Sequence, residues 1–511
     1  MRDKHFVDIK VAQKGIYEGF NTLIAVAPKL LLGGFLLWAI LDQVNAANIL
    51  DSLNKWTTTT FGAWYVWVTA FYVLVCLLLA LWPTTGRVIL GKPDEKPEFS
   101  RFSWFSMMFG AGIGVGMLTY STAEPIFHFA ANPDTIMGAT TGLDADNVRN
   151  AYKWAFLHYG LTPWACYGIV GMSMGYFAYN RGMPLTIRTP LQPLLGSKIT
   201  SGRVGDIIDI VAIIATIIGV SVTIGYGVSQ FTSGFYNITG FEWLLNDQDK
   251  PTLYARLGAL VLIIAASTWS AITGVEKGIK WLSNLNMGLS IFLLLFFAVF
   301  GATAVAFKAY FLGVWDYITA LPSMSLTVWQ NDGTEIGKGL ADWQAGWTIF
   351  YWAWWIAFAP FVGLFLARVS RGRSIREYVF GAMVVSSLMC FTWFALAGGT
   401  AIDLELRGIA EGSIVNANIS AQLFETINLM LSPELAIAMS VVIVILLLTY
   451  LVTSADSAIL IINTIASAGD QSQKHPYHIV VWGSIYAAVI GILLIVGGMD
   501  ALRSAMLIGA L

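Results

Sequence analysis

Long apolar stretches alternate with short polar loops along almost the whole chain. Twelve apolar stretches can be recognised. Most are long enough for a helix rising about 1.5 Å per residue to cross a hydrocarbon core of roughly 30 Å. They cover residues 23–42, 63–83, 101–123, 152–179, 205–234, 254–272, 282–307, 343–369, 378–400, 433–466, 478–498 and 500–511. The last is too short to cross, so we expect the twelfth helix to extend past the end of this sequence.

The composition narrows the class of protein. Of the 511 residues, 57% are hydrophobic and 12% are charged, against roughly 25% charged in soluble domains. Apolar runs of this length predict an all-α integral membrane protein. The net charge of −2 gives no reason to expect nucleic acid as a partner. The first 20 residues are polar, so no cleavable signal peptide is expected. The three cysteines lie in apolar stretches and are expected as buried thiols.

Charged residues in the loops predict the orientation. Lysine and arginine gather before the first stretch and after the second, fourth and eighth, whereas alternate loops carry aspartate and glutamate. Because basic loops stay in the cytoplasm, we expect a multi-pass protein of the inner (plasma) membrane with a cytoplasmic N-terminus. The basic run at 368–376 reflects topology alone, or contact with anionic lipid or a partner helix. Residues 308–330 and 414–431 predict short helices at the outer interface.

The eighth stretch contains an unusual aromatic run, Gly-Trp-Thr-Ile-Phe-Tyr-Trp-Ala-Trp-Trp at 346–355. Tryptophan in a membrane helix normally lies near the headgroups, but here three cluster near the middle of the span. One interpretation is helix packing. The other is a site for a soft cation, because aromatic faces attract ammonium groups, more strongly where water is excluded.

The third stretch carries glycine at every second position from Gly110 to Gly116. Small residues four apart allow close helix contact. Alternatively, the helix is broken there and leaves backbone groups free at mid-membrane, which is tolerated only where they line a cavity. Broken helices form the substrate and ion sites of transporters. The regular two-residue repeat favours the break.

The fourth stretch combines a proline with three aromatic residues. Pro163 is expected to bend the helix. Trp164 and Tyr167, three apart, share a face, and the bend would bring Tyr159 round to them. The neighbouring His158 is interpreted as a hydrogen-bonded structural residue or as a proton carrier.

Isolated hydroxyls inside apolar stretches form a further pattern. Thr453 and Ser454 are adjacent in the tenth stretch, and Thr216 stands alone in the fifth. Such hydroxyls often bond back to the carbonyl four residues earlier. Two adjacent hydroxyls together with carbonyls from a broken helix would instead form an oxygen cage for a small unhydrated cation.

Together these motifs resemble the betaine/carnitine/choline transporter family. The resemblance is carried by Gly-Trp-Thr-x-Phe-x-Trp-x-Trp-Trp at 346–355 and by Ala-Arg-Val-Ser-Arg-Gly-Arg-Ser-Ile-Arg-Glu at 367–377. The glycine stretch, Glu124-Pro125 and residues 453–457 support it, and it runs from about residue 60 to the end.

The resemblance implies twelve transmembrane helices in the fold of sodium-coupled amino-acid transporters, with two inverted five-helix repeats. On this chain it predicts a cytoplasmic N-terminus (1–22), two peripheral helices (23–100), a first repeat (101–307), an interfacial helix with an outer loop (308–342) and a second repeat (343–511). It also implies a homotrimer in the lipid bilayer and a substrate that carries an onium group.

Substrate residues carry over by motif position. The onium cage corresponds to Tyr159, Trp164, Tyr167 and Trp355, and the exit path to Trp354 and Phe358. In sodium-coupled members the first cage position is often Trp, a stronger cation–π partner than Tyr. A carboxylate on the substrate would meet backbone N–H groups at Gly112 and Gly114.

The resemblance also implies sodium as the coupling ion and no other cofactor. The sodium site corresponds to Gly110, Ile113, Tyr450, Thr453 and Ser454. A second sodium site of some members corresponds to Thr216 and Phe361. The threonine expected four residues after Thr216 is Val220 here, so the stoichiometry stays open.

We therefore expect sodium-driven uptake of a quaternary-ammonium or sulfonium osmolyte of the glycine betaine, choline or dimethylsulfoniopropionate type. The alternative is proton-driven uptake by the same fold, for which His158, Glu124 and Asp456 are the candidate carriers. The sequence carries no charged selectivity ring, HExxH or GxSxG motif, or His/Cys cluster, so neither a channel nor an enzyme is expected.

Overall fold

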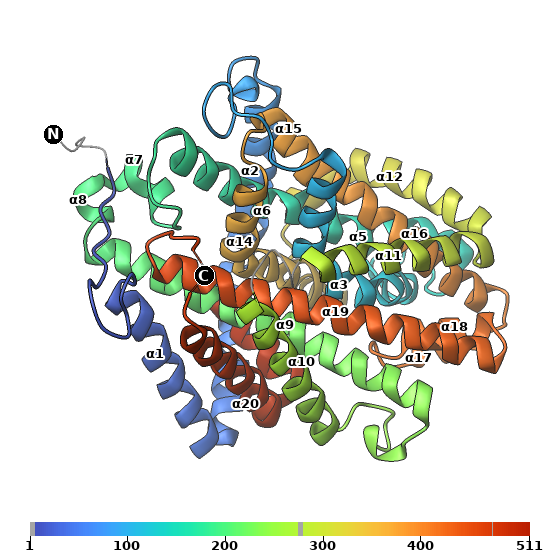
Figure 1. The fold of residues 1–511 in the computed structure, drawn as a ribbon. Helices are drawn as coiled ribbons and strands as arrows, with labels where there is room; N and C mark the ends of the chain where they lie inside the picture. The colour runs from blue at the N-terminus through green and yellow to red at the C-terminus, as the bar shows by residue number, and fades with distance from the viewer. Residues whose placement is uncertain (1–5, 274–279, 473) are drawn as a thin grey trace.

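The computed structural model describes residues 6–273, 280–472 and 474–511, and helices make up most of this part of the chain (Figure 1). Its β contacts are three isolated bridges. The predicted all-α class is therefore confirmed. In the described residues, nine helices are long and apolar enough to cross a membrane.

The long helices follow the predicted stretches closely. They are α1 (Thr22–Leu41), α2 (Gln43–Leu81), α3 (Arg101–Ala130), α9 (Arg203–Thr239), α10 (Leu253–Thr273), α11 (Lys280–Phe300), α14 (Phe350–Val369), α16 (Ser386–Leu406), α19 (Pro433–Ala466) and α20 (Pro476–Gly509). The stretch expected at 152–179 is two shorter helices, α5 (Val148–Tyr159) and α6 (Leu161–Gly175). These two and α3 are not among the nine candidate spans. The division into two inverted repeats stays a prediction.

Shorter elements complete the chain. Residues 308–330 fall largely in α12 (Thr303–Leu326), and residues 414–431 form two pieces, α17 (Ser413–Asn416) and α18 (Gln422–Met430). A glycine pair divides α20 at the predicted boundary between the last two stretches. There Gly498 has φ 63° and ψ −143°, a conformation that residues with side chains rarely adopt.

The expected break in the third stretch is wrong, because α3 is one continuous helix from Arg101 to Ala130. Its backbone groups are therefore engaged in the helix's own hydrogen-bond ladder. Close packing explains at least one of its glycines. A Cβ on Gly114 would lie 2.2 Å from a ring carbon of Tyr450 on α19. The surroundings of Gly112 and Ile113 lie outside the part of the chain whose side chains the structure describes.

Burial separates central from peripheral helices. In the most apolar window of α1 and of α2, 33% of the residues are buried within the protein, against 83% in the helical segment 335–369. The aromatic helix α14 is therefore central, and it packs against α6, α9 and α3. Large apolar side chains on the peripheral helices, such as Leu30 and Leu295, are left exposed, as expected for a lipid-facing surface.

Candidate functional site

The aromatic residues of α14 face the interior of the helix bundle. Trp354 and Trp355 are almost fully buried, and their rings stack 5.2 Å apart at an interplanar angle of 8°. Tyr351, one turn earlier, stacks on Trp355 at 5.6 Å and 24°. A π-helical turn (Ala345–Ile349) precedes α14, and such turns frequently mark functional sites.

The helical chain is interrupted at Gly160, between α5 and α6. Gly160 has φ −85° and ψ −140°, which stops the helix. Pro163, in the first turn of α6, has no N–H to donate to the carbonyl of Tyr159, so the two helices cannot join smoothly. The predicted bend at Pro163 is therefore confirmed, in the form of a break three residues earlier.

Backbone groups released by this break find side-chain partners. The N–H of Leu161 donates to the hydroxyl of Tyr317 at 2.8 Å. The indole N–H of Trp355 donates to the carbonyl of His158 at 3.1 Å. A cage residue on α14 is thus bonded directly to the interrupted helix.

The structure brings the four predicted cage residues together. Around Trp355, the ring of Tyr159 lies 5.7 Å away at 76° and that of Tyr167 lies 6.1 Å away at 84°. Trp164 meets Tyr167 edge-on at 5.9 Å. Aromatic rings from α5, α6 and α14 therefore meet at one place, some edge-on to one another and some stacked. The hydroxyl of Tyr167 and the indole N–H of Trp354 have no hydrogen-bond partner among the described residues.

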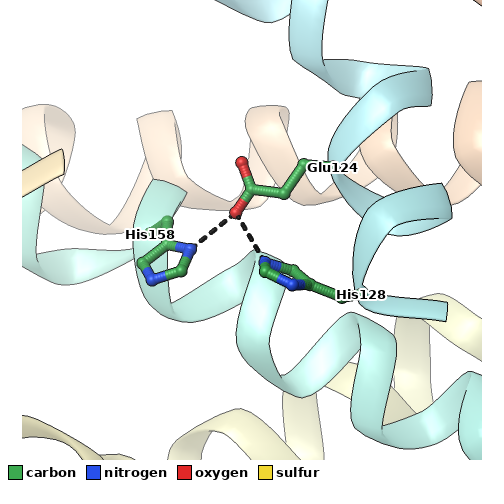
Figure 2. A group of neighbouring side chains, drawn as sticks. All are labelled: Glu124, His128 and His158. Atoms are coloured by element: carbon green, nitrogen blue, oxygen red, sulfur yellow. Dashed lines mark hydrogen bonds and ion pairs between the residues drawn. The ribbon is translucent and has the colours of Figure 1, made fainter. Parts of the chain in front are cut away.

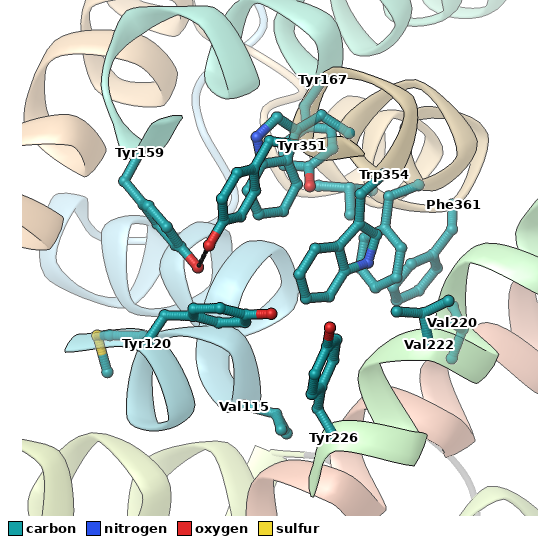
Figure 3. Close-up of a cluster of buried hydrophobic side chains, with 14 of the residues drawn as sticks. Val115, Tyr120, Tyr159, Tyr167, Val220, Val222, Tyr226, Tyr351, Trp354 and Phe361 are labelled. Atoms are coloured by element: carbon teal, nitrogen blue, oxygen red, sulfur yellow. Dashed lines mark hydrogen bonds between the residues drawn. The ribbon is translucent and has the colours of Figure 1, made fainter. Parts of the chain in front are cut away.

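Aromatic residues that were not predicted extend the cluster. Tyr120 on α3 and Tyr226 on α9 flank Trp354 at 6.1 and 5.8 Å, as Figure 3 shows. The ring of Phe358 lies 6.4 Å from that of Tyr167, and its role in an exit path stays a prediction. Tyrosines appear throughout the chain, and their spacing on α3 and α9 gave no signal that could have singled out these two.

A cavity of about 770 Å³ leads to this cluster from the loops after α9 and before α18. Tyr120 and Tyr226 form part of its floor. Three basic residues and one acidic residue line it: Lys250, Arg256, Arg503 and Asp500. The guanidinium of Arg503 lies 4.2 Å above the ring of Phe350, and its Nη2 donates to the carbonyl of Gly346 at 3.0 Å.

Three of the five predicted sodium residues line a second, very small cavity. Its volume is about 20 Å³, enough for one water-sized particle, and Gly110, Tyr450 and Thr453 line it. Asn286 on α11 also lines it and was not predicted; its Nδ2 donates to the Thr453 hydroxyl at 3.1 Å. The buried Oδ1 of Asn286 has no partner among the described residues. Unsatisfied hard oxygen in a cavity of this size fits sodium.

The other predicted ligands stay predictions: Ser454 is buried but does not line this cavity in the described part of the chain, and the side chain of Ile113 lies outside that part. Thr453 also bonds back to the carbonyl of Thr449 at 3.0 Å, so its hydroxyl is partly engaged. At the second site, Thr216 and Phe361 are buried, and the Thr216 hydroxyl has no partner in the described part of the chain. Val220 is buried as well and offers no oxygen (Figure 3).

A polar cluster lies behind the cage, where Glu124, His128 and His158 are fully buried (Figure 2). The Glu124 Oε1 atom lies 2.6 Å from His158 Nδ1 and 3.2 Å from His128 Nε2. Tyr351 donates its hydroxyl to Glu124 Oε2 at 2.5 Å. The structure therefore joins two of the three predicted proton carriers and adds His128.

The third predicted carrier, Asp456, belongs to a different network. Its carboxylate accepts hydrogen bonds from Ser270 at 2.5 Å and from Ser457 at 3.2 Å.

Comparison with known proteins gives consistent matches along the chain. A family model for betaine/carnitine/choline family transporters matches residues 23–511. The glycine betaine transporter OpuD of Bacillus subtilis is 36% identical over 475 residues, which cover 93% of this chain and 88% of the relative. The ectoine/hydroxyectoine transporter of Virgibacillus pantothenticus is 35% identical, covering 91% and 87%. A glycine betaine transporter of Acinetobacter baylyi is 34% identical, covering 97% and 71%.

Proposed function

Because the chain belongs to the betaine/carnitine/choline transporter family, we propose that it imports a betaine-type osmolyte by sodium-coupled symport. The chain is a multi-pass membrane transporter and not an enzyme. The observation that carries the proposal is the buried cage of Tyr159, Trp164, Tyr167 and Trp355. Aromatic faces without competing water are suited to a methylated onium group.

The substrate is proposed to be a zwitterion rather than a bare cation. We call the cavity of about 770 Å³ the outer cavity, because the predicted orientation places its loops outside the cell. It carries three basic residues against one acidic residue, so its electrostatic potential opposes the entry of a cation. A zwitterion carries no net charge to be repelled. Near the cage, the free donors of Tyr167 and Trp354 can receive a carboxylate. These take over the role first expected of the N–H groups at Gly112 and Gly114, which lie in a continuous helix. Names of the relatives, glycine betaine and ectoine transporters, support the same class.

Sodium is proposed to bind between α3, α11 and α19. Gly110, Asn286 and Thr453 contribute one residue from each of these helices to the small cavity. An ion held there would fix α3, which carries Tyr120, against α19. Coupling then follows because the ion and the substrate both stabilise the same arrangement of helices.

Replacing Thr453 with alanine should raise the sodium concentration for half-maximal uptake about tenfold. Losing the contact between the Thr453 hydroxyl and the sodium ion costs roughly 1.5 kcal/mol. This free energy corresponds to about a tenfold change in the dissociation constant of sodium. Radiolabelled glycine betaine uptake into proteoliposomes, measured over a range of external sodium concentrations, tests this.

Thr449→Ala is the matched control, because the Thr449 hydroxyl bonds within its own helix and does not line the cavity. Its sodium dependence should match that of the unaltered protein. Sodium coupling would be refuted if the rate of glycine betaine uptake did not change with a sodium gradient but increased with a pH gradient.

Proton coupling is the second candidate. The buried Glu124–His128–His158 cluster is the observation that favours it, and the same proteoliposome assay separates the two ions.

We propose that the protein forms a homotrimer in the plasma membrane and that its N-terminus lies in the cytoplasm. Each protomer is proposed to contain two inverted repeats. The family resemblance supports the trimer and the repeats, and the alternation of basic and acidic loops supports the orientation.

A further inference from the structure

The Glu124 cluster has an unusual charge balance. Three side chains lie within hydrogen-bond distance of this carboxylate: His128, His158 and Tyr351, of which the Tyr351 hydroxyl is the donor. The ion pairs of Glu124 among the described residues are with the two histidines. The Nε2 atom of His158 lies 3.1 Å from the hydroxyl of Thr348, which can donate to it. With both rings neutral and donating, an ionised carboxylate accepts all three hydrogen bonds, and the Nδ1 atom of His128 has no partner among the described residues.

That arrangement leaves one negative charge to which no described lysine or arginine is paired. An isolated charge in a fully buried site is strongly unfavourable, so it is normally neutralised by a proton or paired with a cation. The other titratable groups around the cluster are phenols, one thiol and one guanidinium: Tyr120 from α3, Tyr159 from α5, Tyr351 from α14, Tyr226 from α9, Cys390 from α16 and Arg503 from α20. Arg503 interacts with the phenols of Tyr120, Tyr226 and Tyr351 and forms no ion pair with Glu124 among the described residues.

One residue connects this charge to the cage. Tyr351 donates to Glu124, its hydroxyl lies 3.3 Å from that of Tyr159, and its ring stacks on Trp355. A cation in the cage would therefore lie within a short distance of the carboxylate, through a medium without water.

The cluster is also close to the outer cavity. Trp347 lines that cavity, and its ring lies 4.6 Å from the ring of His128. The indole of Trp347 therefore contacts both the cavity and the cluster, which gives the cluster a short route to water in the cavity.

We propose that Glu124 is the buried counter-charge of the substrate's onium group, and that a proton and the substrate compete for it. This inference rests on the proposed function. When the cage is empty, a proton neutralises the cluster; when the onium group enters, that proton leaves. Acid should therefore weaken substrate binding. A proton symporter needs the opposite sign, because its proton and substrate bind together.

Glycine betaine binding to the purified protein, followed by tryptophan fluorescence between pH 5.5 and 8.5 at saturating sodium, tests the inference. The dissociation constant of the unaltered protein should rise as the pH falls. Glu124→Gln, which keeps the shape and loses the charge, should bind about tenfold more weakly at high pH and show a flat pH profile. A unit charge about 10 Å away at an effective dielectric constant of about 20 accounts for a factor of this size.

Asp209→Asn is the matched control, because that buried carboxylate is paired with Arg188 at 2.7 Å and belongs to neither the cage nor the sodium cavity. It should keep the pH dependence. Proton release on binding, recorded in weakly buffered solution with a pH indicator, provides a second measurement on the unaltered protein. Tighter binding in acid, proton uptake on binding, or a normal pH profile in Glu124→Gln would overturn the inference. Absence of betaine binding at every pH would instead refute the proposed function.

Discussion

Replacing Trp355 with alanine is expected to weaken glycine betaine binding by one to two orders of magnitude. A desolvated cation–π contact is worth about 1–2 kcal/mol per ring. Trp355 also contacts Tyr159 and Tyr167 and donates its indole N–H to the carbonyl of His158. Its loss therefore removes a cage wall and frees a carbonyl at the chain interruption. Isothermal titration calorimetry on the purified protein measures the change.

Trp482→Ala is the control for this substitution. That tryptophan is equally buried, but it lies on α20 beside Lys29, away from the cage. It should alter thermal stability without altering betaine affinity. Trp164→Ala should weaken binding as Trp355→Ala does. Unchanged affinity in both cage variants would contradict the cage.

Substituting alanine for Gly160 should reduce betaine binding by more than tenfold and also destabilise the protein. The added Cβ would lie 2.4 Å from the Tyr317 hydroxyl and 2.5 Å from the carbonyl oxygen of Phe156. The carbonyl belongs to helix α5 and cannot move aside, so the junction must open, at a cost of about 1–3 kcal/mol. Tyr159, the adjacent residue, would then be displaced from the cage.

Thermal unfolding and betaine titration of the same preparation measure both effects. Gly168→Ala on α6 is the matched control, because its Cβ would make an ordinary contact with Cys76 at 3.9 Å. It should change neither property appreciably. Equal behaviour of the two alanine variants would show that the interruption at Gly160 does not position the site.

Helix positions could be predicted from the sequence because hydrophobic length is a local property. The interrupted helix was assigned to the wrong segment because glycine has two roles in membranes. In α3, Gly114 makes room for the ring of Tyr450 and the helix continues. At Gly160, one glycine together with Pro163 stops the helix. The combination with a proline was the more reliable signal, because proline removes a backbone donor.

The cage residues could be predicted because they lie in two compact motifs that the family resemblance identifies. His128 and Asn286 could not be, since their roles depend on which helix faces meet. His128 reaches Glu124 on its own helix and packs against Trp347 from another. Asn286 joins the proposed sodium site through its hydrogen bond to Thr453, which is 167 residues away in the chain. Tyr351 lies within the aromatic motif but was not among the predicted site residues. Its hydroxyl, beside apolar neighbours, was the signal that could have identified it.

Comparing glycine betaine with its carbon analogue 3,3-dimethylbutanoate, in which a neutral tert-butyl group replaces the trimethylammonium group, tests the central claim most directly. The two molecules share their shape and carboxylate, and differ in the positive charge that the aromatic faces are held to bind. With titration calorimetry at saturating sodium, we expect the carbon analogue to bind at least tenfold more weakly than glycine betaine. Equal affinity for the two would show that the buried rings recognise shape alone, and would contradict an onium site.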